Sequence, residues 1–94
     1  MIIKQFYIEI EGVEELKSFV LKQTDDIEDC EEGRIVILVL KGGERYTGRF
    51  HGMDEDDSVV MLDSLKSDMR IGARVKWIAH YFEEEVITLN KINE

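Results

Sequence analysis

The chain has 94 residues, of which 44% are apolar and 35% charged, and its formal net charge is −9. This length suits one domain, because two separate cores would each bury too little surface to be stable. The apolar fraction excludes a disordered chain, and no run approaches the roughly 18 apolar residues of a membrane-spanning helix. We therefore expect a single domain over residues 1–94, with 1–32 as an N-terminal extension and 33–94 as its main body.

The cellular location is predicted from the N-terminus and from cysteine usage. Residues 1–10 have apolar character, but Glu9 and Glu11 interrupt it and no small-residue cleavage site follows, which disfavours a secretory signal. The lone Cys30 cannot form an internal disulfide. We expect a cytoplasmic protein without contact to a membrane.

Two N-terminal segments differ in their apolar spacing. Residues 2–10 alternate apolar and polar side chains, which predicts a strand outside the main body. From Val13 to about Thr24 apolar residues recur every three or four positions, which predicts an amphipathic helix. The acidic run from Asp25 to Glu32 is interpreted as a solvated helix end and linker, and the alternatives are a cation site or a surface for a basic partner.

The middle of the chain predicts three strands. Ile35 to Leu40 are six consecutive apolar residues, typical of a strand buried on both faces. Glu44 to Met53 alternates apolar and polar residues, and the glycines inside it predict a bend, a bulge or a close approach of backbone. Ser58 to Leu62 is the third predicted strand.

The C-terminal third predicts two more strands. Met69 to Phe82 alternates throughout, which predicts one long, bent strand with Trp77 and Tyr81 on its apolar face. Val86 to Ile92 is predicted as a further strand.

Residues 35–62 resemble the first motif of the Sm and Sm-like (LSm) family. The matching positions are Leu40, Gly43, Tyr46, Gly48, Phe50, Met53 and Asp54. Other SH3-like small barrels, such as those of ribosome-maturation factors and biotin ligases, share this pattern and remain alternatives. The fold class that the resemblance implies is mainly β: an N-terminal α-helix followed by a strongly bent five-stranded antiparallel small barrel.

The resemblance also implies an RNA-binding loop, and this chain departs from its pattern. Asp54 occupies the family's Asp position, but Asp56 stands where a stacking ring is expected and Ser58 where an Asn is expected. A carboxylate in place of the ring removes stacking of about 1–3 kcal/mol per base. A basic patch from two predicted strands could contact nucleic acid instead, with solubilising surface charge as the alternative; its residues are Arg45, Arg49, His51, Arg74 and Lys76.

Charge is divided unevenly along the chain. Residues 1–32 carry three lysines and ten acids, whereas residues 34–76 carry eight basic and seven acidic side chains. The net charge of −9 therefore does not by itself exclude phosphate binding by the second region.

The sequence offers little for catalysis. It has no nucleophile and base that can be paired, no phosphate-cradling Gly-Lys-Ser/Thr loop and no zinc ligand set. The acidic loop from Asp54 to Asp57 is the remaining metal candidate, but adjacent carboxylates on a turn point in different directions. We expect no enzyme, no cofactor and no metal.

Assembly is predicted from strand edges. Sm-like proteins pair the fourth strand of one subunit with the fifth of the next, which closes a ring. The resemblance thus implies a homo-oligomeric ring scaffold with single-stranded RNA as its ligand. The alternative function is an SH3-like module that docks a basic protein through its acidic N-terminal helix. The candidate ring interface comprises Arg74, Val75, Lys76, Trp77, Ile78, Ala79, His80, Tyr81, Val86, Ile87, Thr88, Leu89 and Asn90.

Overall fold

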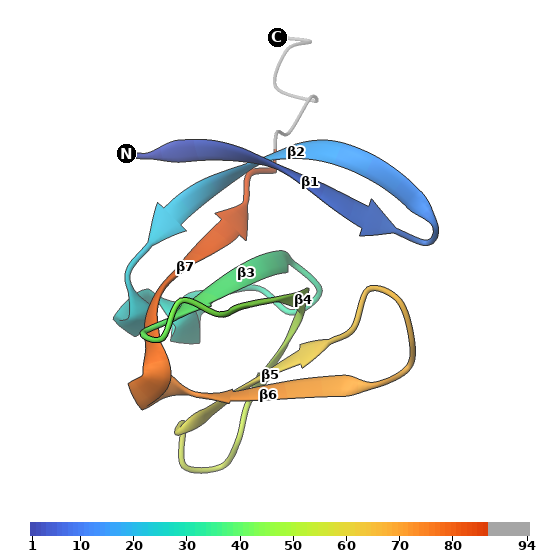
Figure 1. The fold of residues 1–94 in the computed structure, drawn as a ribbon. Coiled ribbons are helices and arrows are strands. Elements are labelled where there is room, and N and C mark those ends of the chain that lie inside the picture. Colours follow the sequence, from blue (N-terminus) through green and yellow to red (C-terminus); the bar gives the residue numbers. More distant parts are fainter. Residues whose placement is uncertain (87–94) are drawn as a thin grey trace, which may run out of the picture.

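One antiparallel sheet organises the chain (Figure 1). A computed structural model describes residues 1–86, and its sheet has seven strands in the order β1-β2-β7-β3-β4-β5-β6. The strands are β1 (Ile3–Ile10), β2 (Val13–Lys22), β3 (Ile35–Leu40), β4 (Arg45–Met53), β5 (Val59–Asp63), β6 (Arg70–Arg74) and β7 (Ile78–Glu84). Two 3₁₀ segments connect them, η1 (Thr24–Asp29) and η2 (Val75–Trp77).

The predicted N-terminal helix is wrong, because its residues form β2. Residues 3–10 are a strand, β1, as predicted. β1 is paired with β2 over the whole length of β1, from Ile3↔Val20 to Ile10↔Val13. Glu11 and Gly12 both have positive φ, of 50° and 82°, which is the backbone of a tight hairpin turn. Pairing with β1, and burial of Phe19, outweigh the helical spacing of the apolar residues.

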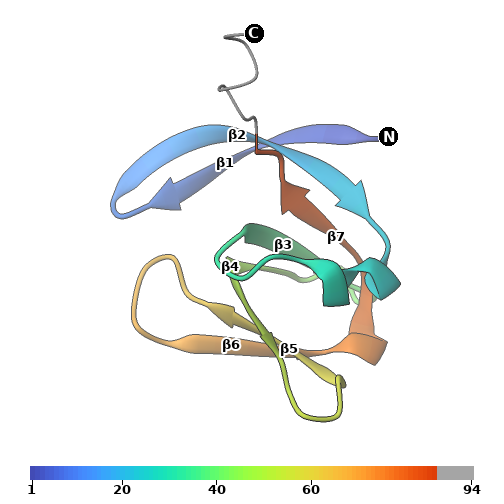
Figure 2. The same cartoon turned by 180° about the vertical axis from the view of Figure 1, so that it is seen from behind.

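The hairpin of β1 and β2 changes the layout of the core. β3 is buried on both faces, as its apolar run predicts. Its even-numbered residues join a core with β4, β5 and β6 that includes Phe50, Leu62 and Tyr81. Its odd-numbered residues Ile35 and Ile37 join a second core beneath the hairpin, which includes Phe19. Figures 1 and 2 show the hairpin arched over β3 on one side and the β5–β6 pair on the other.

Gly48 confirms the close approach of backbone predicted for β4. A Cβ at this position would lie 2.7 Å from the carbonyl oxygen of Asp63 and 2.9 Å from Cβ of Leu62. The register between β4 and β5 then shifts between Phe50 and Gly52, so the predicted bulge is also present.

The long strand predicted over residues 69–82 is broken into β6, η2 and β7. The 3₁₀ turn at Val75–Trp77 leaves Trp77 53% exposed, and a register shift between β3 and β7 at Val39/Leu40 then lets both Ile78 and Tyr81 be buried. β7 is also paired on both sides within the chain. Its pairing with β3 begins at Val36↔Glu83, and its pairing with β2 runs from Phe19↔Glu84 to Lys22↔Tyr81.

The two free edges of the described sheet are therefore β1 and β6. The single hydroxyl hydrogen of Thr24 is shared between the carbonyl oxygens of Ile78 and Ala79, each 3.3 Å from its Oγ1, and so Thr24 covers the first part of β7. A ring through residues 74–82 remains untested, and most of its second segment, residues 87–90, lies outside the described residues.

The predicted fold class is thus corrected in two respects. Residues 1–86 form one open sheet of seven strands, in place of a five-stranded barrel, and they contain no α-helix. What stands is a small all-β structure with an antiparallel, strongly bent sheet (Figure 2). None of the helical segments in this part of the chain is long and apolar enough to cross a membrane.

Candidate nucleic-acid interface

Basic side chains gather on the outer face of β4, β5 and β6. Val60 and Leu62 of β5 are buried, so the alternate residues Val59, Met61 and Asp63 face outward. The register places Arg49 of β4 and Arg70 of β6 on either side of Asp63, and Arg74 opposite Val59. We call this set of basic side chains the basic strip; its members are Arg49, His51, Arg70, Arg74 and Lys76.

Asp63 holds two members of the strip in place. Nδ1 of His51 donates to its Oδ2 at 3.2 Å, and Nε of Arg70 donates to its Oδ1 at 3.2 Å. Both pairs are partly exposed, so they orient the two basic side chains more than they stabilise the fold. Four members of the strip are arginine or lysine, so they outnumber the nearby carboxylates of Asp63 and of Asp54, which lines a hollow with Arg74 and Lys76.

Trp77 ends the strip. Trp77 is 53% exposed, the guanidinium carbon of Arg74 lies 5.4 Å from its ring centre, and Nζ of Lys76 lies 6.0 Å from it. The backbone fixes this corner, because the amide of Val75 donates to the carbonyl of Ser58 and the amide of Lys41 to that of Trp77. Cation–π contacts of this kind hold a ring and its cations together at the surface.

Two hollows flank Arg74. The larger, of about 550 Å³, lies toward the β4–β5 turn and is lined by Asp54, Ser58, Val59, Arg74, Val75 and Lys76. The smaller, of about 270 Å³, includes Tyr46, Gly72 and Trp77 in its lining. The corner therefore offers recesses on both sides of its central cation.

Of the three loop residues implied by the family motif, Asp54 and Ser58 are hydrogen-bonded to each other across the turn. The amides of Ser58 and Val59 donate to Oδ1 of Asp54 at 2.8 and 3.0 Å, and the hydroxyl of Ser58 donates to Oδ2 at 3.0 Å. These hydrogen bonds hold the pKa of Asp54 below its ordinary value, and the bond from the Ser58 amide has the largest effect. Asp56 is exposed in the same turn.

The structure separates Arg45 from the other predicted basic residues. Its guanidinium carbon lies 5.5 Å from the ring centre of Phe6, beneath the N-terminal hairpin. Arg49, His51, Arg74 and Lys76 share the strip, whereas Arg45 lies outside it.

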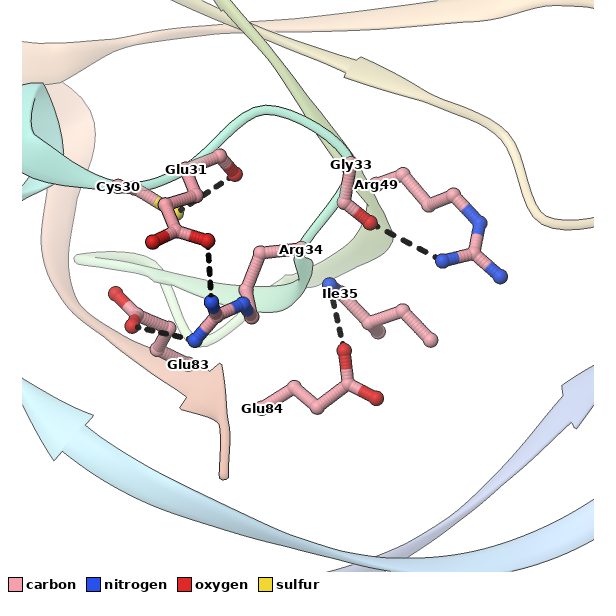
Figure 3. A network of polar contacts seen from close by, with 8 residues as sticks. All are labelled: Cys30, Glu31, Gly33, Arg34, Ile35, Arg49, Glu83 and Glu84. Carbon is pink, nitrogen blue, oxygen red and sulfur yellow. Dashed lines mark hydrogen bonds and ion pairs between the residues drawn. The ribbon is translucent and has the colours of Figure 1, made fainter. Parts of the chain in front are cut away.

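Arg49 also meets a polar network at the ends of β3 and β7 (Figure 3). Its Nη1 donates to the carbonyl of Gly33 at 3.1 Å. In the same network Arg34 contacts carboxylates of Glu31 at 2.6 Å and Glu83 at 3.6 Å. These contacts join the strands to one another, so we interpret this network as structural.

Glu84 anchors the other half of that network. It accepts a hydrogen bond from the amide of Ile35 at 3.2 Å and pairs with Nζ of Lys17 at 2.9 Å. Burial raises the pKa of Glu84, but the Lys17 contact and the Ile35 amide outweigh it, so the pKa lies below its ordinary value.

For the buried Cys30, desolvation and then the charge of Glu83 raise the thiol pKa to about 12.

Two site residues were missed at the sequence level. Arg70 lies in the same alternating series as Arg74, and that spacing was the available signal. Trp77 was placed with Tyr81 on an apolar face, and the 3₁₀ turn that exposes it leaves no clear sequence signal.

The other predicted interface residues near this corner have mixed environments. Ile78 and Tyr81 are buried in the core, while Ala79 is exposed and His80 packs its ring edge-on against Phe82 at 5.8 Å. Among residues 1–86, no three His, Cys, Asp or Glu side chains are grouped so that they could hold a metal ion.

Comparison with known proteins adds no assignment: no family model, curated protein or solved structure matches this chain.

Proposed function

We propose that the protein is a non-enzymatic binding module for single-stranded nucleic acid and that the basic strip with Trp77 is its binding surface. The observation that carries the proposal is the half-exposed Trp77, whose ring centre lies within about 6 Å of the cations of both Arg74 and Lys76. Exposed rings stack on unpaired bases while neighbouring cations contact the phosphates. A base must be free of its complement to stack in this way, which favours a single strand.

The strip continues this arrangement away from Trp77. Arg70 and Arg74 are four residues apart on β6, about 13 Å at the usual rise of a strand. Arg49 and His51 extend the charge across β5. A backbone lying along the strip would meet several cations in succession while one of its bases covers Trp77.

The overall charge limits the strength of binding. The chain carries −9, so its long-range field does not attract phosphate, and the local strip must supply the attraction. We therefore expect weak, strongly salt-dependent binding with little preference among bases, because stacking tolerates every base.

The experiment measures binding of U-rich and A-rich RNA oligonucleotides as a function of salt. Three or four phosphate contacts predict a slope of log K against log salt between about −2 and −3, at about −0.7 for each contact. Arg74→Ala should flatten the slope by about 0.7. Lys4→Ala is the matched control, because Lys4 lies over Phe6 on the hairpin, away from the strip.

Two results would contradict the proposal. The first is no binding of either oligonucleotide at low salt. The second is equal weakening by Lys4→Ala and Arg74→Ala, which would indicate attraction to charge anywhere on the protein.

A further inference from the structure

The free edge of β1 is a second surface with unsatisfied chemistry, distinct from the basic strip. The amide of Leu21 donates to the carbonyl of Ile2 at 2.9 Å. This bond shows which residues of β1 turn their backbone groups toward β2 and which turn them away. By the alternation of an antiparallel ladder, the backbone groups of Lys4, Phe6, Ile8 and Ile10 point toward β2. Those of Ile3, Gln5, Tyr7 and Glu9 therefore point outward from the sheet.

This edge carries charges at Lys4 and Glu9 but lacks two other features that normally protect an exposed strand. It runs for eight residues without proline, and its register with β2 shows no bulge. Apolar side chains are also concentrated on the hairpin: of nine exposed large apolar residues in the described chain, six are Met1, Ile2, Ile3, Tyr7, Val13 and Leu16. An added strand would pair with the open backbone and cover part of this apolar surface.

A hollow of about 440 Å³ lies beside the edge, between the hairpin and the β5–β6 connection. Ile8, Leu65 and Ile71 supply apolar lining, and the acidic residues Glu9 and Glu14 lie at its rim on β1 and β2. Glu9 and Glu14 are directly opposite each other in the β1–β2 register, so their like charges repel. Lys66 is the cation in this lining.

We infer that the β1 edge and this hollow bind an extended segment of a partner protein that places an arginine or lysine side chain in the hollow. The aliphatic stem of such a side chain would pack on Ile8, Leu65 and Ile71. Its charge would lie near Glu9 and Glu14 and relieve their repulsion. Main-chain pairing with the edge supplies affinity, and the hollow supplies the preference for a basic residue.

The test uses synthetic eight-residue peptides in which valine alternates with arginine or with glutamate, titrated by calorimetry. Gln5→Pro removes an outward amide of the edge without removing a β1–β2 backbone hydrogen bond, since edge strands tolerate proline. Gln5→Ala is the matched control: both variants lose the 3.5 Å side-chain contact to Ser18, and neither changes the charge.

The arginine peptide should bind the wild type and Gln5→Ala alike and bind Gln5→Pro at least tenfold more weakly. The glutamate peptide should not bind. The double variant Glu9→Gln/Glu14→Gln should also bind the arginine peptide at least tenfold more weakly, and it tests the hollow even if Gln5→Pro fails to fold. RNA affinity should be unchanged in all folded variants, which separates this inference from the proposed function.

The inference is overturned if the arginine peptide does not bind at millimolar concentration, or if both Gln5→Pro and the double glutamine variant bind it as the wild type does. It is also overturned if the wild type forms a dimer that Gln5→Pro abolishes, because a second copy would then occupy the edge.

Discussion

Replacing Phe19 and Leu16 separately by alanine distinguishes the hairpin from an amphipathic helix. Phe19 is 0% exposed, and its ring meets that of Phe6 edge-on at 5.6 Å within the core beneath the hairpin. Truncation of a buried Phe typically costs about 3–5 kcal/mol, a large part of the 5–15 kcal/mol that usually stabilises a domain. We expect Phe19→Ala to lower the free energy of unfolding by this amount.

Leu16 is the matched comparison on the same strand. It lies opposite Tyr7 on the outer face of the hairpin and is 48% exposed. Because a fully buried Leu contributes about 1.5–3 kcal/mol, Leu16→Ala should cost about 1 kcal/mol or less. In a helix, residues three apart share one face, so both truncations would be costly.

Urea unfolding followed by far-UV circular dichroism measures both variants. A loss for Phe19→Ala that exceeds the loss for Leu16→Ala by about 2 kcal/mol or more supports the strand. Equal losses would refute the reasoning, because they would place both side chains in the same buried layer.

Three further outcomes follow from the structure. The pKa of Glu84 is lowered in the folded state, so the stabilising contribution of Glu84 is complete above its ordinary pKa of 4.5 and is lost as pH falls. The free energy of unfolding should therefore fall less steeply with acid in Glu84→Gln than in the wild type. Cys30 is buried with its thiol pKa raised to about 12, so Ellman's reagent at pH 8 should modify it rapidly only after urea is added, and rapid stoichiometric reaction of the native protein would disprove this. Gly48→Ala should cost about 1–3 kcal/mol because its Cβ overlaps Asp63, while Gly72→Ala, whose Cβ meets its nearest atom at 3.5 Å, should change the unfolding midpoint little.

Local patterns predicted the strands of the middle of the chain. The apolar run of β3 carried enough information because both of its faces are buried. The glycines of β4 were informative because one approaches the backbone of Asp63 closely and another lies at a bulge. In each case the cause is local or involves the next strand.

The N-terminal error has a non-local cause. The spacing of Val13, Leu16 and Phe19 fits one face of a helix, and only the pairing with β1 and β7 selects the strand. The mistaken environment of Trp77 arises similarly, since a three-residue 3₁₀ turn changes which face of the chain is buried. The strip was therefore predicted in part: alternation identified Arg49 and Arg74, but the ring that completes the site was assigned to the core or an interface.

The chain has one tryptophan, so its fluorescence reports directly on the binding surface. Titration of the wild-type protein with a U-rich RNA oligonucleotide at low salt should quench Trp77 emission in a saturable way, and added salt should reverse the quenching. Unchanged emission at RNA concentrations that saturate a separate binding assay would contradict stacking on Trp77, and the absence of any binding would contradict the proposed function itself.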